Sequence, residues 1–132
     1  MSRSSYSNSV IGFLNDDKEN IRNILVNKTP NATGQQKNAW DETIEFLQNQ
    51  LAGIQDGRIM LEYTIPRMGR RVDAVLLHNN IVFVMEFKCG DTEYARHTID
   101  QVYGYVQDLK NFQKESENKL LVPIIIPTKA QP

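Results

Sequence analysis

The sequence of 132 residues contains one cysteine, Cys89, and no long hydrophobic run. A single cysteine cannot build a disulfide framework or a zinc site made of several cysteines. No stretch approaches the roughly 20 apolar residues that a membrane-spanning helix needs. The N-terminal segment also lacks the apolar core of a secretory signal peptide. We therefore expect an intracellular, cytoplasmic protein with no membrane partner.

An excess of one charge sign is also absent, since 15 Lys and Arg stand against 16 Asp and Glu, for a formal net charge of −1. A basic excess is the usual mark of a nucleic-acid-binding protein, so the composition alone does not indicate one. Local clustering matters more than the sum, and Arg67, Arg70 and Arg71 lie within five residues. These arginines could contact phosphates, or they could form the solvated tip of a hairpin.

The hydrophobic fraction of 40% is too high for intrinsic disorder and fits one globular domain. Hydrophobic spacing predicts short helices in the first third of the chain. It then predicts a longer helix over 35–52, in which Trp40, Ile44, Leu47 and Leu51 form one stripe. We divide the chain into an N-terminal helical extension over 1–34 and a core over 35–132.

Apolar runs predict strands over 59–65, 72–77, 81–88 and 120–126, with a further helix over 98–114. Asn79 and Asn80 suit a two-residue turn, because asparagine tolerates a positive φ. A right-handed helical crossover should make the last strand parallel to the third, and Pro123 predicts that this strand is an edge strand or bulged. The expected fold is α/β, with a mixed four-stranded sheet flanked by helices and with extra N-terminal helices.

Two acidic side chains should meet on this predicted hairpin. With a two-residue turn at Asn79 and Asn80, Asp73 lies opposite Glu86, and opposed residues have Cβ atoms about 5 Å apart. Two carboxylates at that distance repel each other unless they share a proton or a divalent cation. Strand periodicity places Lys88 on the same face as Glu86. The sequence therefore predicts two carboxylates and an ammonium group at the end of a hairpin.

Carboxylate oxygens suit Mg²⁺ or Mn²⁺. Such an ion polarises a phosphoryl oxygen and generates a hydroxide nucleophile, and Lys88 could hold the attacking water or stabilise charge in the transition state. The alternative is that Asp73, Glu86 and Lys88 form a structural ion-pair cluster.

Asp73 and the Glu86-Phe87-Lys88 triplet, preceded by a helix and followed by a helix and a strand, resemble the PD-(D/E)xK nuclease superfamily. The order of predicted elements over 35–127 matches its restriction-endonuclease-like αβββαβ core. Gln101 and Tyr105 match the Q-x-x-x-Y motif of the RecB-type branch, in which this helix lies beside the metal site. The resemblance implies a hydrolase: a Mg²⁺- or Mn²⁺-dependent DNA nuclease.

Site residues follow from this resemblance. Asp73, Glu86 and the backbone carbonyl of Phe87 would hold the metal, Lys88 would activate water or stabilise the transition state, and Gln101 with Tyr105 would orient Lys88 or the scissile strand. Many members carry a further acid on the first core helix, and the candidates here are Asp41, Glu42 and Glu45. The superfamily's first acid often follows a proline, whereas Val72 precedes it here.

The chain is also similar to the N-terminal region of an uncharacterised bacterial family, in which a nuclease-like module precedes a Schlafen-related, helicase-like ATPase domain. This similarity is carried by YSNSVIGFL at 6–14, NAW at 38–40, EYTIPRMGRRVD at 62–73 and VFVMEFK at 82–88. No Walker A motif occurs in the sequence, so we expect a fragment of a longer, helicase-associated protein. RNA remains open as a substrate, and the alternative function is an inactive nuclease-fold module that binds DNA or a protein partner.

Overall fold

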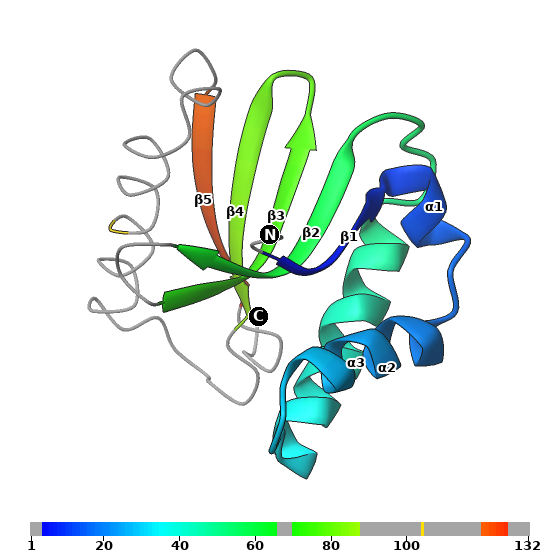
Figure 1. Ribbon diagram of the computed structural model, residues 1–132. Coiled ribbons are helices and arrows are strands. Elements are labelled where there is room, and N and C mark those ends of the chain that lie inside the picture. The colour runs from blue at the N-terminus through cyan, green and yellow to red at the C-terminus, as the bar shows by residue number, and fades with distance from the viewer. Residues whose placement is uncertain (1–3, 66–69, 88–103, 105–119, 127–132) are drawn as a thin grey trace.

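The computed structural model describes residues 4–65, 70–87, 104 and 120–126 of the chain. It contains helices and one sheet, so the expected α/β class is confirmed, and Figure 1 shows the three helices gathered beside the sheet. The elements in chain order are β1 (Ser4–Ser9), α1 (Val10–Leu14), α2 (Lys18–Lys28), α3 (Gly34–Gln50), β2 (Arg58–Ile65), β3 (Arg70–His78), β4 (Ile81–Phe87) and β5 (Leu120–Ile126).

The sheet has the strand order β1-β2-β3-β4-β5. The first four strands pair antiparallel and β5 pairs parallel to β4, which confirms the predicted meander followed by a parallel strand. Pro123 lies in β5, at one edge of the described sheet, which agrees with the edge strand that this proline predicts. The predicted helix over 98–114 lies outside the described residues apart from Gly104, which is helical.

The predicted number of strands is wrong, because the described sheet has five strands rather than four. The additional strand is β1, in a segment that we assigned to a helical extension. Its sequence SSYSNS has little β-propensity, and only Tyr6 in it is buried. Its pairing with β2, from Ser4 opposite Tyr63 to Ser9 opposite Arg58, joins residues far apart in sequence. No local pattern could therefore reveal it.

The hydrophobic core lies between the helices and one face of the sheet. The predicted stripe of α3 is confirmed, and the structure buries it against side chains of all three helices and of β2, β3 and β4. A second buried cluster lies on the opposite face and contains Tyr63, Val72, Val75, Val82 and Val84. Both faces of the central strands are therefore apolar, which explains why their sequences are nearly continuous hydrophobic runs.

The turn between β3 and β4 has the predicted geometry. His78 pairs with Ile81, and the two residues between them, Asn79 and Asn80, have φ values of 52° and 63°. Two central residues with positive φ define a type I′ turn, whose twist matches that of antiparallel strands. This turn fixes which residues of β3 and β4 face each other.

None of the helices in the described part of the chain is both long enough and apolar enough to cross a membrane.

The turn generates a testable prediction. Asn80→Ala should lower the free energy of unfolding by about 1 kcal/mol, because a Cβ without a compensating polar group is unfavourable at positive φ. Asn80→Gly is the matched control, since glycine adopts this conformation without steric cost. Urea denaturation of both variants measures the difference, and equal losses in the two would contradict the role of φ.

Candidate active site

Asp73 and Glu86 face each other where the pairing of β3 and β4 ends. The last paired residues are Ala74 and Met85, one step closer to the turn, so the predicted register is confirmed. Beyond them the backbone N–H of Asp73 donates to Oε1 of Glu86 at 3.0 Å, and the backbone N–H of Phe87 donates to Oδ2 of Asp73 at 2.6 Å. Each carboxylate is thus bonded to the opposite strand.

These bonds fix the orientation of both acidic groups. Glu86 is only 6% exposed, and a buried carboxylate is unfavourable unless hydrogen bonds or a cation compensate it. A hydrogen bond from an amide to an ionised carboxylate is stronger than one between neutral groups. Because a carboxylate has about four acceptor positions, the amide bonds are compatible with metal coordination at the same side chains.

A third acid, Glu62, lies in the same row. It stands on β2 between Leu61, which pairs with Ala74, and Tyr63, which pairs with Val72, and it is therefore opposite Asp73. Glu62 is 7% exposed and has a φ of 53°. The structure thus brings three carboxylates to one level of β2, β3 and β4.

Glu62 is not among the predicted site residues, because strand alternation in IMLEYTI makes it an ordinary polar position. The available signal was the loop before β3. Ile65 pairs with Arg70 across four residues, and a four-residue loop at that place would have aligned Glu62 with Asp73.

The β2–β3 hairpin changes face at this level. Leu61 belongs to the core beneath the helices, whereas Tyr63 belongs to the cluster on the opposite face, although residues two apart in a regular strand share a face. Ala74 and Val72 show the same change on β3. In Figure 1 the last part of β2 and the first part of β3 bend away from the rest of the sheet. Glu62, with its left-handed φ of 53°, lies between Leu61 and Tyr63, where this change of face occurs.

The pKa of the Glu62 carboxyl is raised from its ordinary value of 4.5 to about 7, and burial is the largest cause. The negative charge of Asp73 is the second cause of this increase, while the Arg71 guanidinium and a hydrogen bond with Trp40 lower the pKa. In that bond the indole N–H donates to the carboxylate. Arg71 Nη1 lies 3.6 Å from Glu62 Oε1, and the Arg71 side chain is 43% exposed. A positive, solvent-facing group therefore stands beside the row of acids.

The remaining predicted residues divide by position. Phe87 ends β4 in the hydrophobic core, with its ring 5.5 Å from that of Phe46. Arg70 begins β3. The others lie outside the described residues: Arg67, Lys88, Gln101 and Tyr105.

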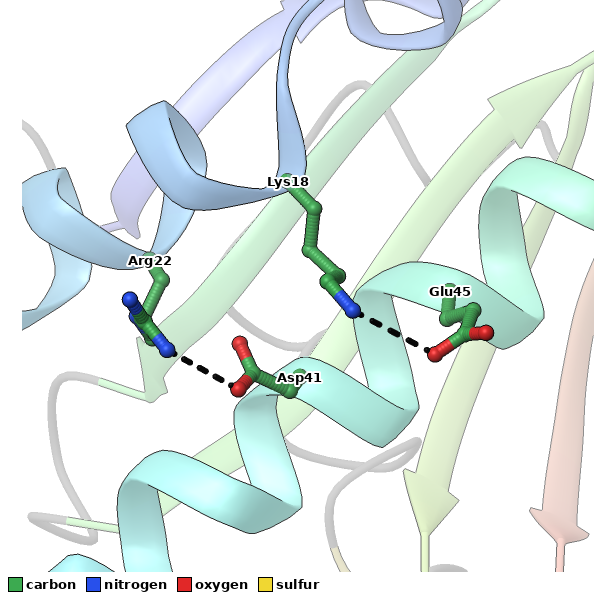
Figure 2. A network of polar contacts seen from close by, with 4 residues as sticks. All are labelled: Lys18, Arg22, Asp41 and Glu45. Atoms are coloured by element: carbon green, nitrogen blue, oxygen red, sulfur yellow. Dashed lines mark hydrogen bonds and ion pairs between the residues drawn. The ribbon is translucent and has the colours of Figure 1, made fainter.

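Two of the three candidate acids on α3 point toward α2. Figure 2 shows the two ion pairs that these acids form. Asp41 Oδ2 lies 3.0 Å from Arg22 Nη1, and Glu45 Oε2 lies 3.5 Å from Lys18 Nζ. These ion pairs connect α2 to α3, so both acids already have basic partners on α2. The third candidate, Glu42, is half-buried, and its part in the site stays a prediction.

Mg²⁺ is commonly held by one or two carboxylates, with water and substrate phosphates completing the octahedron. Asp73 and Glu86 supply two carboxylates at one place, and their oxygen donors fit Mg²⁺ or Mn²⁺. Within the described ranges, no group of three or more His, Cys, Asp or Glu side chains is arranged to hold a metal ion. Among the described side chains, the case for a Mg²⁺ or Mn²⁺ site therefore depends on Asp73 and Glu86 alone.

Comparisons with protein-family models, with curated proteins and with solved structures find no match for this chain. Its function has to be inferred from its own residues and their geometry.

Trp40 is the only tryptophan in the sequence, so its fluorescence should report the ionisation of Glu62. In metal-free buffer we expect the emission to titrate with a midpoint near the raised pKa of about 7. Glu62→Gln should abolish this transition, whereas Glu45→Gln, on the α2 side of α3, should preserve it. A transition that persists in Glu62→Gln would show that another group is responsible.

The same pKa shift predicts how stability depends on pH. A carboxyl whose pKa is higher in the folded state than in the unfolded state holds its proton more tightly when folded. Stability is therefore lost as pH rises from the unfolded pKa of about 4.5 to about 7. Between about pH 4 and pH 8, the unfolding free energy of Glu62→Gln relative to wild type should shift by about 3 kcal/mol in favour of the variant. Denaturation in EDTA at several pH values measures this, and a constant difference would refute it.

Proposed function

We propose that the chain is a metal-dependent nuclease domain, similar to the PD-(D/E)xK superfamily, that hydrolyses phosphodiester bonds in DNA. The observation that carries this proposal is the opposition of Asp73 and Glu86 across β3 and β4, each held by a backbone amide of the other strand. The order of α3, three antiparallel strands and a parallel β5 agrees with a restriction-endonuclease-like core.

In this proposal Asp73, Glu86 and the carbonyl of Phe87 bind Mg²⁺ or Mn²⁺. The bound ion would polarise the scissile phosphoryl group and lower the pKa of a water molecule. The bond from the Phe87 N–H holds the Asp73 carboxylate in place. A side chain fixed before the metal arrives loses little conformational freedom on binding it.

Other roles in this proposal rest on the sequence motif. Lys88 activates the attacking water or stabilises the developing charge, and Gln101 with Tyr105 orients Lys88 or the scissile strand. Arg67, Arg70 and Arg71 contact the DNA backbone. A helicase-like ATPase domain in cis and a cytoplasmic location belong to the same proposal.

The alternative is an inactive nuclease-fold module that binds DNA or a protein partner. One observation favours it: the bonds from Asp73 and Glu86 to backbone amides also join the end of the hairpin. If the two carboxylates serve only to join β3 to β4, they need no metal.

A cleavage assay tests the proposal. The protein is incubated with single-stranded, duplex and branched DNA, and with RNA, in Mg²⁺, Mn²⁺ or EDTA. We expect DNA cleavage that requires the metal and falls by about 100-fold or more in Lys88→Ala and in Asp73→Asn. Asp73→Asn retains an oxygen that accepts the Phe87 N–H while it loses the charge, so the hairpin should remain folded.

Asp56→Asn serves as the control, because Asp56 is a 75% exposed carboxylate paired with His78 near the other end of the hairpin. It should cleave like the wild type. Equal cleavage by wild type and Asp73→Asn would overturn the assignment of the metal site. Salt-sensitive DNA binding without hydrolysis under any condition would instead establish the inactive module.

A further inference from the structure

Glu62 occupies an energetically unfavourable position in the sheet. Its backbone has a left-handed φ of 53°, its side chain is 7% exposed, and Asp73 lies opposite it. Strain, burial of an acid and repulsion between like charges all oppose this arrangement. Features of this kind concentrate at functional sites, where they are retained for what they position.

The contacts of Glu62 show what it positions. Its carboxylate accepts a hydrogen bond from Trp40, a buried anchor of α3, and it pairs with Arg71 on β3. Trp40 is 5% exposed and belongs to the core, so it gives the carboxylate a rigid support. Arg71 is 43% exposed, so Glu62 connects the core to a cation at the surface.

Arg71 is well placed for a phosphate. Glu62 is opposite Asp73, and Arg71 precedes Asp73 by two residues on the same strand, which is the diagonal position within reach of a long side chain. A guanidinium has five N–H donors in a fixed fork, so its pairing with Glu62 leaves donors to bond a phosphate.

The other arginines whose side chains are described lie elsewhere. Arg22 bonds to Asp41 on α3, and Arg58 donates from Nε to Ser7 Oγ at 2.9 Å, at the opposite end of β2. Among the described side chains, Arg71 is therefore the arginine beside the acidic row.

We propose that Glu62 is a positioning residue, whose carboxylate holds the Arg71 guanidinium beside the Asp73–Glu86 pair so that Arg71 contacts a backbone phosphate of bound DNA. The inference rests on the proposed function for its ligand, DNA, but it concerns binding and does not require cleavage.

The direction in which one substitution changes the affinity for DNA distinguishes this role from a purely electrostatic effect of the Glu62 charge. Removing a negative charge near bound DNA reduces repulsion and should strengthen binding. If Glu62 holds Arg71 in place, Glu62→Gln should weaken binding instead, because the guanidinium loses its anchor.

The experiment measures the affinity of labelled single-stranded and duplex DNA by fluorescence anisotropy, with Ca²⁺ in place of Mg²⁺, at about pH 8, where Glu62 is ionised. The proteins are wild type, Glu62→Gln, Arg71→Ala and the double variant, with Glu45→Gln as a control that removes a distant acidic charge. We expect Glu62→Gln to weaken binding roughly threefold to tenfold. Arg71→Ala should weaken it at least as much and reduce the salt dependence by about one phosphate contact.

In the Arg71→Ala background, Glu62→Gln should have no further effect, because the two residues act as one unit. An equal effect in both backgrounds would show a structural role and overturn the inference, as would tighter binding by Glu62→Gln. Binding with this coupling but without cleavage in Mg²⁺ would support the inference and refute the nuclease. A wild-type protein that binds no DNA would overturn both.

Discussion

The two-residue turn at Asn79 and Asn80 determines the geometry of the candidate site. Pairing in an antiparallel hairpin propagates from the turn, so the turn decides which residue of β4 stands opposite Asp73. One additional residue there would shift the register and move side chains of one strand to the other face. The opposition of Asp73 and Glu86 lies several residues from the turn but depends on it entirely. Positive φ values at two adjacent asparagines are the local condition on which this arrangement rests.

Burial of acidic side chains and repulsion between them oppose folding at this level of the sheet. Glu62, Asp73 and Glu86 stand on three adjacent strands, and the structure compensates them with backbone amides, an indole N–H and a guanidinium. Such compensation is directional, so each acid has a defined orientation. Neutralising Glu62 would favour folding while it removes the support of Arg71. If Glu62 positions Arg71 for DNA as we propose, stability and ligand contact make opposite demands on this one side chain, as is common at functional sites.

The parts of the fold predicted correctly are those with local signals. Strand alternation, the stripe of α3 and the asparagine turn each lie within one short segment, and together they gave the β3–β4 register and so the Asp73–Glu86 pair. Two features had no such signal. The strand β1 depends on pairing with β2 across the intervening helices, and the left-handed φ of Glu62 is a property of one residue at a bend. Lys88, Gln101 and Tyr105 remain predictions.

The pairing of β1 has a consequence for the order of folding. This strand lies at the N-terminal end of the chain, yet it hydrogen-bonds to β2 on both sides of Glu62, at Leu61 and Tyr63. During synthesis it emerges well before its partner strand and must stay unpaired until β2 follows. Contacts between segments distant in sequence form slowly, because the intervening loop must close first. The pairing of β1 beside Glu62 is therefore completed late, after the helices between β1 and β2 have been synthesised.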